Sequence, residues 1–467
     1  MATLSDRPTP DPAEAKVRGR GQRAVTVRGD LAEVGARPVG FDPVQVIVDQ
    51  SVGRLASLVP IRYQRMLASP FSFLRGAAAI QARDLSRGPS TPIEVQLCGD
   101  AHLMNFGVFS SPERQLVFDV NDFDETAVGP FEWDLKRLVA SFAVAGESNG
   151  LSAKQRERIV RAVVASYRVA MRRFAGESFL ELWYESPDVS VLESVVASHF
   201  GDETQRRIDR AISRAKAKTA EKAFAKLVEV VNGRPQIKHD PPLLVPLADL
   251  SKPDDLARER AFLYELVDHY AATLPSDCEA LVRRFTPVDA AMKVVGVGSV
   301  GTRCWIVLLF GRDGDDPFFL QVKEAGVSVI DQARGFTSAH EPGERVVRGQ
   351  RLMQVDSDIF LGWYTLPGLD GVTRSFYVRQ LYDNKASAIV EQMDAGTMAV
   401  YANACGWTLA RAHARSGIAG EINGYCGTSS SFEDAIVAYA DAYRVRNNED
   451  HAAFQQAAAE GRITAAS

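Results

Sequence analysis

The sequence predicts an α+β protein in which a large helical lobe surrounds a small antiparallel sheet. Apolar residues recur at helical spacing from Trp133 to about Arg284, and again from about Thr397. Between these stretches, runs of β-branched and aromatic residues alternate with glycine-rich turns, a pattern typical of short antiparallel strands. The order along the chain is therefore helical, then sheet, then helical again.

The composition agrees with an ordinary soluble globular protein. The chain has 467 residues, of which 46% are apolar and 24% charged. A net charge of −5 argues against a dedicated nucleic-acid binder, because phosphate contacts require a strongly basic surface. No uncharged apolar run is long enough to predict a membrane-spanning helix. Five scattered cysteines and the absence of an apolar leader predict free buried thiols in a cytoplasmic protein.

The N-terminal third is predicted to contain a mobile arm followed by helices. Residues 1–40 are rich in Pro, Arg, Gly and Asp and have few large apolar groups, so they cannot offset the entropy of ordering. Residues 41–285 are predicted to form the helical lobe with the catalytic and metal-binding loops, beginning with a helix over about 42–57. The next helical stretch, residues 61–85, is interrupted at Ser69-Pro70, because the residue before a proline disfavours helix.

Strands are predicted in two places. Residues 93–98 and 115–120 form short strands inside the helical lobe. Residues 286–383 form a small β-rich nucleotide-binding lobe, with strands in KVVGVGSVG, CWIVLLF, FFLQVKEA and SFYVRQLYD. GRDGDD is a hairpin turn between the second and third of these strands, and a helix around 343–353 precedes the last. Residues 384–467 are predicted to be helices that complete the large lobe.

Polar side chains cluster in CGDAHLMNFG and in FDVNDFDE, two segments at the ends of predicted strands. The candidate residues are Asp100, His102, Asn105, Asp122 and Asp124. Carboxylate and amide oxygens are the ligands that Mg²⁺ prefers, alongside phosphate oxygens of a substrate. Phosphoryl transfer needs an Asp to orient the attacking hydroxyl, and an Asn and an Asp on the metal. Turn-forming Asx residues are the alternative for either segment, but the two together favour a functional site.

A glycine-rich segment, GVGSVG, matches G-x-G-x-x-G. Its residues of interest are Gly296, Gly298, Ser299 and Gly301. A dinucleotide-binding fingerprint must open a helix, whereas TRCWIVLLF after this loop is a predicted strand. A glycine loop between two strands lays backbone amides over nucleotide phosphates, and Lys323 on the next strand is positioned to contact them. Glu344 on the following helix could hold Lys323 in an ion pair. The alternative for Lys323 is an ordinary strand lysine paired with Glu324.

The GDAHLMNFG and NDFDE segments resemble the HGDLHxxN and DFD/DFG elements of aminoglycoside and choline phosphotransferases, members of the kinase-like superfamily. In both patterns the His lies two residues and the Asn five residues after the Asp. Asp134 in WDLKRL resembles the helix start that follows the metal Asp in those enzymes. With RMLASPFSFLRG, YVRQLYDNKAS and LARAHARSG, the chain from about residue 40 to 450 resembles the bacterial DUF2252 family, a group named for its unknown function.

The order of the motifs departs from that of kinases, in which the glycine loop and Lys precede the catalytic loop and the metal Asp. Here the glycine loop comes later, and LARAHARSG, which resembles the helix before a catalytic loop, lies near the C-terminus. Rotating the sequence restores the kinase order, so we predict a circularly permuted, two-lobed protein-kinase-like fold. Such a fold requires Lys323 to face Asp122 across a cleft. Cys98 stands where many relatives have His, which leaves the support of this loop open.

The resemblance implies an ATP- and Mg²⁺-dependent phosphotransferase that acts on a hydroxyl of a small-molecule acceptor. It assigns Asp100 and His102 as catalytic, Asn105, Asp122 and Asp124 as metal ligands, and Gly296, Gly298, Ser299, Gly301, Lys323 and Glu344 as nucleotide-binding residues. Two alternatives stay open. One is a nucleotide-binding pseudokinase with a regulatory role, and the other is a metal-dependent phosphoesterase built on the acidic loops without nucleotide.

Overall fold

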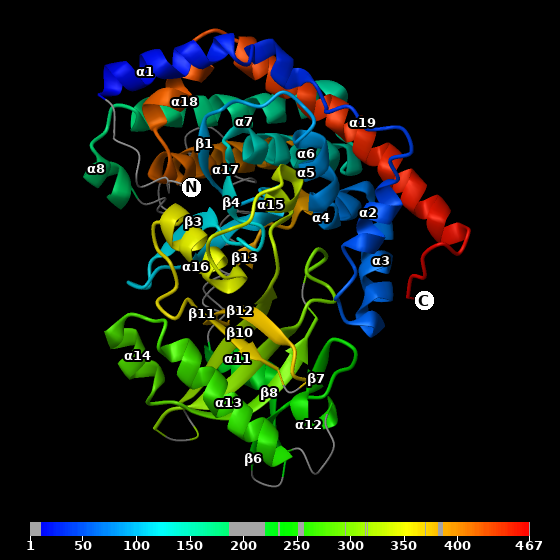
Figure 1. Cartoon of the computed structure of the whole chain (residues 1–467), viewed down its shortest axis with the longest axis vertical. Coiled ribbons are helices and arrows are strands. Elements are labelled where there is room, and N and C mark those ends of the chain that lie inside the picture. Colours follow the sequence, from blue (N-terminus) through cyan, green and yellow to red (C-terminus); the bar gives the residue numbers. More distant parts are fainter. Residues whose placement is uncertain are drawn as a thin grey trace.

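The computed structural model describes residues 11–185, 220–231, 234–250, 256–294, 296–312, 314, 316–368, 370–381 and 386–466. Within these ranges the protein is a mixed α+β structure, as the sequence predicts. Helices build one end of the molecule and an antiparallel sheet with its own helices builds the other (Figure 1). We call these ends the helical part and the sheet part. Residues 1–10 of the predicted arm lie outside the described residues.

Segments from both chain ends build the helical part. The helices are α1 (Pro12–Gly21), α2 (Pro43–Asp49), α3 (Val59–Leu67), α4 (Pro70–Gly76), α5 (Ala78–Leu85), α6 (Glu132–Ser148), α7 (Ala153–Phe174), α8 (Phe179–Tyr184), α17 (Ala395–Ser416), α18 (Ala419–Cys426) and α19 (Ser431–Ala459). The blue N-terminal helix α1 packs against the orange α18, and the red α19 runs along the same side (Figure 1). The two ends of the chain therefore share one core.

Local signals set where these helices begin and end. Ser69 accepts a hydrogen bond from the backbone N–H of Ser72, and Pro70 occupies the first turn, which explains the predicted break before α4. α17 ends at Ser416, and Gly417 follows as its C-cap. α2 is shorter than predicted and ends at Asp49, because the chain then turns through Gly53, whose φ is 85°.

Two small sheets carry the acidic loops. They are formed by β1 (Glu94–Leu97) with β4 (Ala127–Pro130), and by β2 (Phe106–Ser110) between β3 (Leu116–Val120) and β13 (Ala386–Ser387). β1 and β3 were predicted, whereas β2 and β4 are too short and glycine-containing to stand out in the sequence. The loops after β1 and β3 are brought together by these pairings, since Asn121 N donates to Asn105 O at 2.9 Å.

A six-stranded antiparallel sheet dominates the sheet part, in the order β11-β12-β10-β9-β8-β7. The strands are β7 (Leu244–Pro246), β8 (Thr286–Lys293), β9 (Cys304–Phe310), β10 (Pro317–Ala325), β11 (Gly362–Pro367) and β12 (Thr373–Gln380), and β5 (Val228–Val231) with β6 (Arg234–Ile237) adds a separate hairpin. β9, β10 and β12 match predicted strands, and β9 and β10 pair across the predicted GRDGDD hairpin. The strand predicted in KVVGVGSVG is wrong, because β8 ends at Lys293 and residues 296–300 form a turn; the hairpin β5–β6, the edge strands β7 and β11 and most of β8 were not predicted.

The sheet part also contains helices. Its helices are α11 (Ala220–Leu227), α12 (Leu247–Leu250), α13 (Leu256–Ala271) and α14 (Ser276–Val282). Val267 and Tyr270 of α13 share an apolar core with Leu309 and Phe318 of the sheet. α13, which lies within the predicted helical lobe of residues 41–285, thus packs on the sheet, because helical periodicity reveals an apolar face but not its partner. Two later helices, α15 (Val329–Arg334) and α16 (Pro342–Met353), pack instead into the core of the helical part.

The predicted mobile arm is wrong for residues 11–40. Leu31 is fully buried in the main core. Arg37 forms ion pairs with Asp84 at 2.7 Å and with Asp450 at 2.6 Å. Arg23 donates to the carbonyl of Tyr425 at 2.9 Å. A composition poor in apolar residues conceals this order, because the segment is held mainly by arginine contacts to distant helices.

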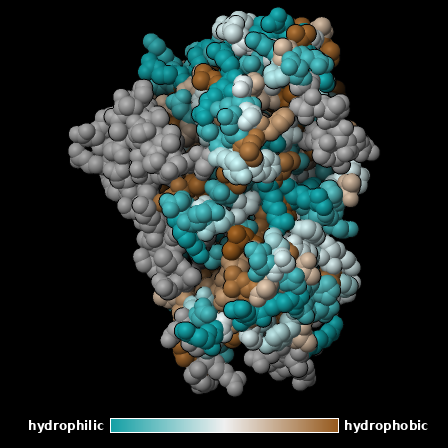
Figure 2. Space-filling model, turned by 90° about the vertical axis from the view of Figure 1, so that its left-hand side faces the viewer, coloured by the Kyte–Doolittle hydropathy of each residue, from teal (hydrophilic) through white to brown (hydrophobic). Residues whose placement is uncertain are grey.

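The described surface is mixed in polarity. Hydrophilic residues cover most of both ends of the face in Figure 2, and hydrophobic residues lie among them mainly in the middle, where the two parts meet. None of the described helices is both long enough and apolar enough to cross a membrane. All five cysteines are free and buried, which confirms the predicted thiols.

Candidate functional site

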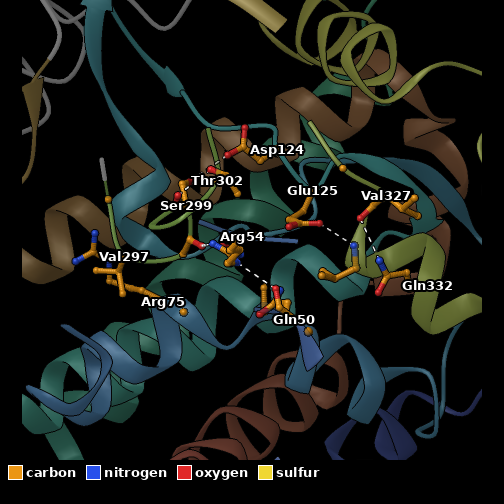
Figure 3. Close-up of a pocket in the computed structure, with 18 of the residues that line it drawn as sticks. Gln50, Arg54, Arg75, Asp124, Glu125, Val297, Ser299, Thr302, Val327 and Gln332 are labelled. Carbon is orange, nitrogen blue, oxygen red and sulfur yellow. Dashed lines mark hydrogen bonds between the residues drawn. The ribbon is translucent and has the colours of Figure 1, made fainter. Parts of the chain in front are cut away.

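A cavity of about 440 Å³ lies where the acidic loops, the glycine loop and the N-terminal helices meet (Figure 3). The predicted site residues that line it are Asp100, His102, Asn105, Asp122, Asp124, Gly296, Gly298 and Ser299. Lys323 contacts two of these lining carboxylates without lining the cavity itself. The structure therefore brings together nearly all of the residues that the motifs single out, although they come from two distant stretches of sequence.

The loop after β1 is fixed by a buried carboxylate of α6. Asp134 accepts hydrogen bonds from the backbone N–H groups of Cys98 at 2.7 Å and Gly99 at 3.0 Å. Asp134 also lies 3.3 Å from Nε2 of His413, whose Nδ1 is 2.9 Å from the hydroxyl of Tyr167. The loop is thus supported through its backbone, which answers how it is held with Cys98 in place of His.

Asp100 is held in one orientation at the cavity wall. The Nε of Arg137 donates to Asp100 Oδ1 at 2.7 Å, and the same guanidinium donates to Gln81 Oε1 and Leu74 O. Arg137 is only 3% exposed, so this charge-assisted bond is shielded from water. Such an arrangement suits a carboxylate that must orient a hydroxyl, because its position is set before the ligand arrives.

His102 lies beside Asp100, with Nε2 3.8 Å from Asp100 Oδ2, beyond hydrogen-bonding distance. Burial lowers the pKa of His102 to about 3; Asp100 opposes this effect, while Arg75 and Arg137 add to it. The imidazole is therefore neutral at physiological pH and a poor proton acceptor. Its buried Nδ1 has no hydrogen-bond partner among the described residues. The geometry suits His102 as a hydrogen-bonding group for a ligand.

Asn105 and Asp122 are the residues that fit a metal ion. The amide nitrogen of Asn105 donates to Asp100 O at 2.7 Å, which leaves its Oδ1 as an acceptor. Asp122 lines the same cavity. Two oxygen ligands fit Mg²⁺, because this ion usually keeps several waters and takes further oxygens from a substrate. In the described part of the chain, no three His, Cys, Asp or Glu side chains form a closed metal cage.

Lys323 joins the sheet part to the second acidic loop. Its Nζ lies 2.9 Å from Asp124 Oδ2 and 3.9 Å from Asp122 Oδ1. Tyr377, directly opposite Lys323 on β12, donates to Asp124 Oδ1 at 2.5 Å. Burial opposes the charge of Lys323, but Asp122 and Asp124 raise the pKa of the amine well above its usual range. Burial likewise opposes ionisation of Asp124, whereas Lys323 and Tyr377 lower the pKa of that carboxyl.

One predicted role needs correction and another is qualified by the geometry. Asp124 accepts hydrogen bonds from Tyr377 at Oδ1 and from Lys323 at Oδ2, so a metal ion at this residue would share both oxygens with these donors. Glu344 does not fix Lys323 and pairs instead with Arg348 at 2.7 Å. The next residue along α16, Arg345, turns inward and donates to the carbonyls of Asp124 and Gly326. A one-residue step rotates a helical side chain by about 100°, so the spacing alone could not decide which residue faces the loop.

The glycine loop is shaped by its glycines. Gly296 and Gly301 have φ values of 65° and 91°, which residues with a side chain rarely adopt. The hydroxyl of Ser299 donates to Asp124 Oδ2 at 3.2 Å, so the loop touches the second acidic loop.

Two residues of the site were missed in the sequence. Arg54 binds the glycine loop, and Glu125 lines the cavity beside Asp124. Burial raises the pKa of Glu125 to about 7. The only sequence signal for Glu125 is its place at the end of NDFDE. Arg54 has no signal, because a single arginine after a helix resembles any surface residue.

The fold and the site define a mixed α+β protein with a polar cavity between a helical part and an antiparallel sheet, in which a glycine loop faces two acidic loops. The chain belongs to a family described as "Uncharacterized protein conserved in bacteria (DUF2252)", whose model matches residues 54–457. This match confirms the family resemblance seen in the sequence. Comparisons with curated proteins and with solved structures find no match.

Proposed function

We propose that this protein is an ATP- and Mg²⁺-dependent phosphotransferase with a circularly permuted protein-kinase-like fold, acting on a hydroxyl of a small molecule. The observation that carries the proposal is the ion pair between Lys323 and Asp124, two residues 199 positions apart in the sequence. It supports the proposal because the permuted arrangement needs the lysine that follows a glycine loop to lie close to the loop of Asp122.

Each group of residues has a distinct task in this reaction. The glycine loop offers backbone amides to the phosphates, and Lys323 supplies a cation beside them. Asn105 and Asp122 would hold Mg²⁺, which neutralises charge on the phosphates when bound. Asp100, oriented by Arg137, accepts a hydrogen bond from the acceptor hydroxyl and directs its oxygen towards the phosphate.

A metal-dependent phosphoesterase is less well supported. It would be built on Asp100, His102, Asp122 and Asp124 without nucleotide. Asp100 is bound by Arg137, and Asp124 is bound by Lys323 and Tyr377. A nucleotide-binding pseudokinase would share the nucleotide site and differ only in lacking turnover.

Nucleotide binding is tested with Asp122→Asn. Wild-type protein should be stabilised by ATP with Mg²⁺, by about 2.7 kcal/mol at a hundredfold excess over Kd. The variant should lose the Mg²⁺-dependent part of this stabilisation while its melting temperature without ligand changes little, because Asp122 borders the cavity. Asp441→Asn, which changes a 66% exposed carboxylate on α19, is the matched control and should behave like wild type. Undiminished stabilisation in Asp122→Asn would exclude the metal assignment.

Turnover is tested with Asp100→Asn. This variant should bind ATP within about threefold of wild type but lose at least about 100-fold in ATP consumption, followed by phosphorus NMR. Nucleotide binding without consumption in wild type, with any hydroxyl acceptor tried, would favour the pseudokinase. Phosphate release from a phosphoester without nucleotide would favour the phosphoesterase.

A further inference from the structure

Arg54 reaches from the helical part to the glycine loop of the sheet part. Its Nη1 donates to the carbonyl oxygens of Gly298 at 2.7 Å and Val300 at 2.6 Å, and its Nε donates to Gln50 O at 3.1 Å. The backbone strengthens the same contact, since Leu55 N donates to Gly301 O at 2.8 Å. The segment after α2 therefore donates hydrogen bonds to three carbonyl groups of the glycine loop.

The glycine loop leaves room for this side chain. A Cβ on Gly301, where φ is 91°, would lie 3.1 Å from the Cβ of Arg54. Figure 3 shows Arg54 near the centre of the cavity, between Ser299 and Gln50. Arg54 therefore lines the cavity next to the glycine loop.

The charge of Arg54 has no counter-ion in direct contact. Its hydrogen bonds go to neutral backbone carbonyls, and none of the described carboxylates lies within ion-pairing distance of its guanidinium. Burial lowers the pKa of Arg54, and Glu125, Asp124 and Glu324 oppose this effect only from a distance. Arginine remains charged in proteins, so a partly buried guanidinium on a cavity wall favours an anionic ligand.

Arg65 provides an internal comparison. Arg65 lies on α3 and, like Arg54, donates to a carbonyl of the glycine loop, in this case that of Gly296. Its bond to the loop is exposed to solvent, whereas the bonds of Arg54 are partly buried, and Arg65 does not line the cavity. The two arginines share the task of holding the loop, but only Arg54 is placed to touch a ligand.

We propose that Arg54 is a phosphate-binding residue of the nucleotide site, contributed by the N-terminal segment. This inference rests on the proposed function and deepens it. Nη1 holds the glycine loop, and Nη2, which takes part in none of the bonds described above, donates to phosphate oxygens of the nucleotide. The phosphate site is therefore composite, with Lys323 from the sheet part and Arg54 from the helical part.

The test compares ligands that differ in phosphate number. Calorimetry would measure the binding of adenosine, AMP, ADP and ATP, with Mg²⁺, to wild type, Arg54→Gln and Arg65→Gln. Arg54→Gln should weaken ATP and ADP at least tenfold, and adenosine less than twofold, because a charged hydrogen bond to phosphate is lost. Arg65→Gln should affect all four ligands to the same small extent. Equal losses for adenosine and ATP in Arg54→Gln would overturn the proposal, because they would show a loop-holding role alone.

Tripolyphosphate separates this inference from the proposed function. It should raise the melting temperature of wild type and of Arg65→Gln but not that of Arg54→Gln. If tripolyphosphate stabilises wild type and Arg54→Gln loses this effect, but wild type does not bind ATP, then Arg54 binds an anion and the nucleotide function is refuted. ATP binding that is unchanged in Arg54→Gln would retain the function and overturn the inference. If Arg54→Gln fails to fold, Arg54→Lys keeps the charge without the guanidinium fork and should show a weaker form of the same phosphate-dependent loss.

Discussion

The loop after β1, which carries Asp100, and the glycine loop meet in the cavity and are held in different ways. The loop after β1 is supported by one buried helix, α6. Asp134 binds two of its backbone amides, Arg137 binds Asp100, and the hydroxyl of Ser141 accepts a bond from Leu103 N at 3.0 Å. All three supporting side chains are at most 3% exposed.

The glycine loop is held by residues that are far from it in the sequence. Arg54, in the segment after α2, and Arg65, on α3, bind its carbonyls from more than 230 positions earlier in the sequence. Neither arginine is fully buried. The acidic loop is thus preorganised within one core, whereas the position of the glycine loop depends on contact between two parts of the protein. Under the proposed function, this difference gives a rigid site for the acceptor and an adjustable cover for the phosphates.

Asp134→Asn should remove the support of the loop after β1 and should have the largest effect on the free energy of unfolding. The amide group cannot accept both backbone N–H bonds, so a buried donor is left facing another donor. We expect a loss of about 2 to 4 kcal/mol in the free energy of unfolding. Urea denaturation followed by tryptophan fluorescence would measure it.

The exposed carboxylate of Asp441 provides the control for this change. Asp441→Asn removes only a surface ion pair with Arg444, so it should alter stability by less than about 0.5 kcal/mol. Equal stabilities of the two variants would show that the bonds from Asp134 contribute little to the fold.

Gly301→Ala should disturb the glycine loop with a smaller effect on stability. The φ of 91° is strained for alanine, and the new Cβ would crowd Arg54, so we expect a loss of about 1 to 2 kcal/mol. ATP affinity should fall as well. Gly314→Ala in the hairpin between β9 and β10 is the control, because its Cβ would meet no atom within 4 Å. A variant Gly301→Ala with normal stability and affinity would show that the loop adapts freely.

Glu125→Gln tests the raised pKa of this carboxyl, next to the second acidic loop, through the pH dependence of stability. Burial raises the folded-state pKa of Glu125 to about 7, against roughly 4.3 in an unfolded chain. The folded protein holds this proton more tightly, so its stability is fully present below about pH 4.3 and falls as the pH rises through 7. The neutral Gln avoids this loss and can still accept the hydrogen bond from Val329 N. The stability of the variant relative to wild type should therefore rise by about 2.5 kcal/mol between pH 5 and pH 8.

Thermal unfolding at the two pH values would measure this gain. Glu157→Gln, at a carboxylate that is 55% exposed on α7, serves as the control and should show no such trend. A constant difference between Glu125→Gln and wild type at both pH values would contradict the raised pKa.

Much of the fold and most of the site could be predicted from the sequence. The caps and prolines marked helix starts such as α4, and long β-branched runs marked β9 and β10. The residue types after β1 and β3 indicated an oxygen-rich site, which the cavity brings together. Short strands such as β2 and β7 escaped detection because a few residues carry too little periodicity to separate a strand from a loop.

The sequence by itself determined local structure and the chemistry available, namely the carboxylates, the amide, the lysine and the glycines of the loop. The tertiary structure alone decided which of them meet. It paired Lys323 with Asp124 where Glu344 was expected, turned Arg345 inward, and brought Arg54 onto the glycine loop. It also ordered the N-terminal segment and placed α13 on the sheet. The physical reason is that periodicity and capping depend on neighbours in the chain, whereas these contacts depend on which buried faces pack together across hundreds of residues.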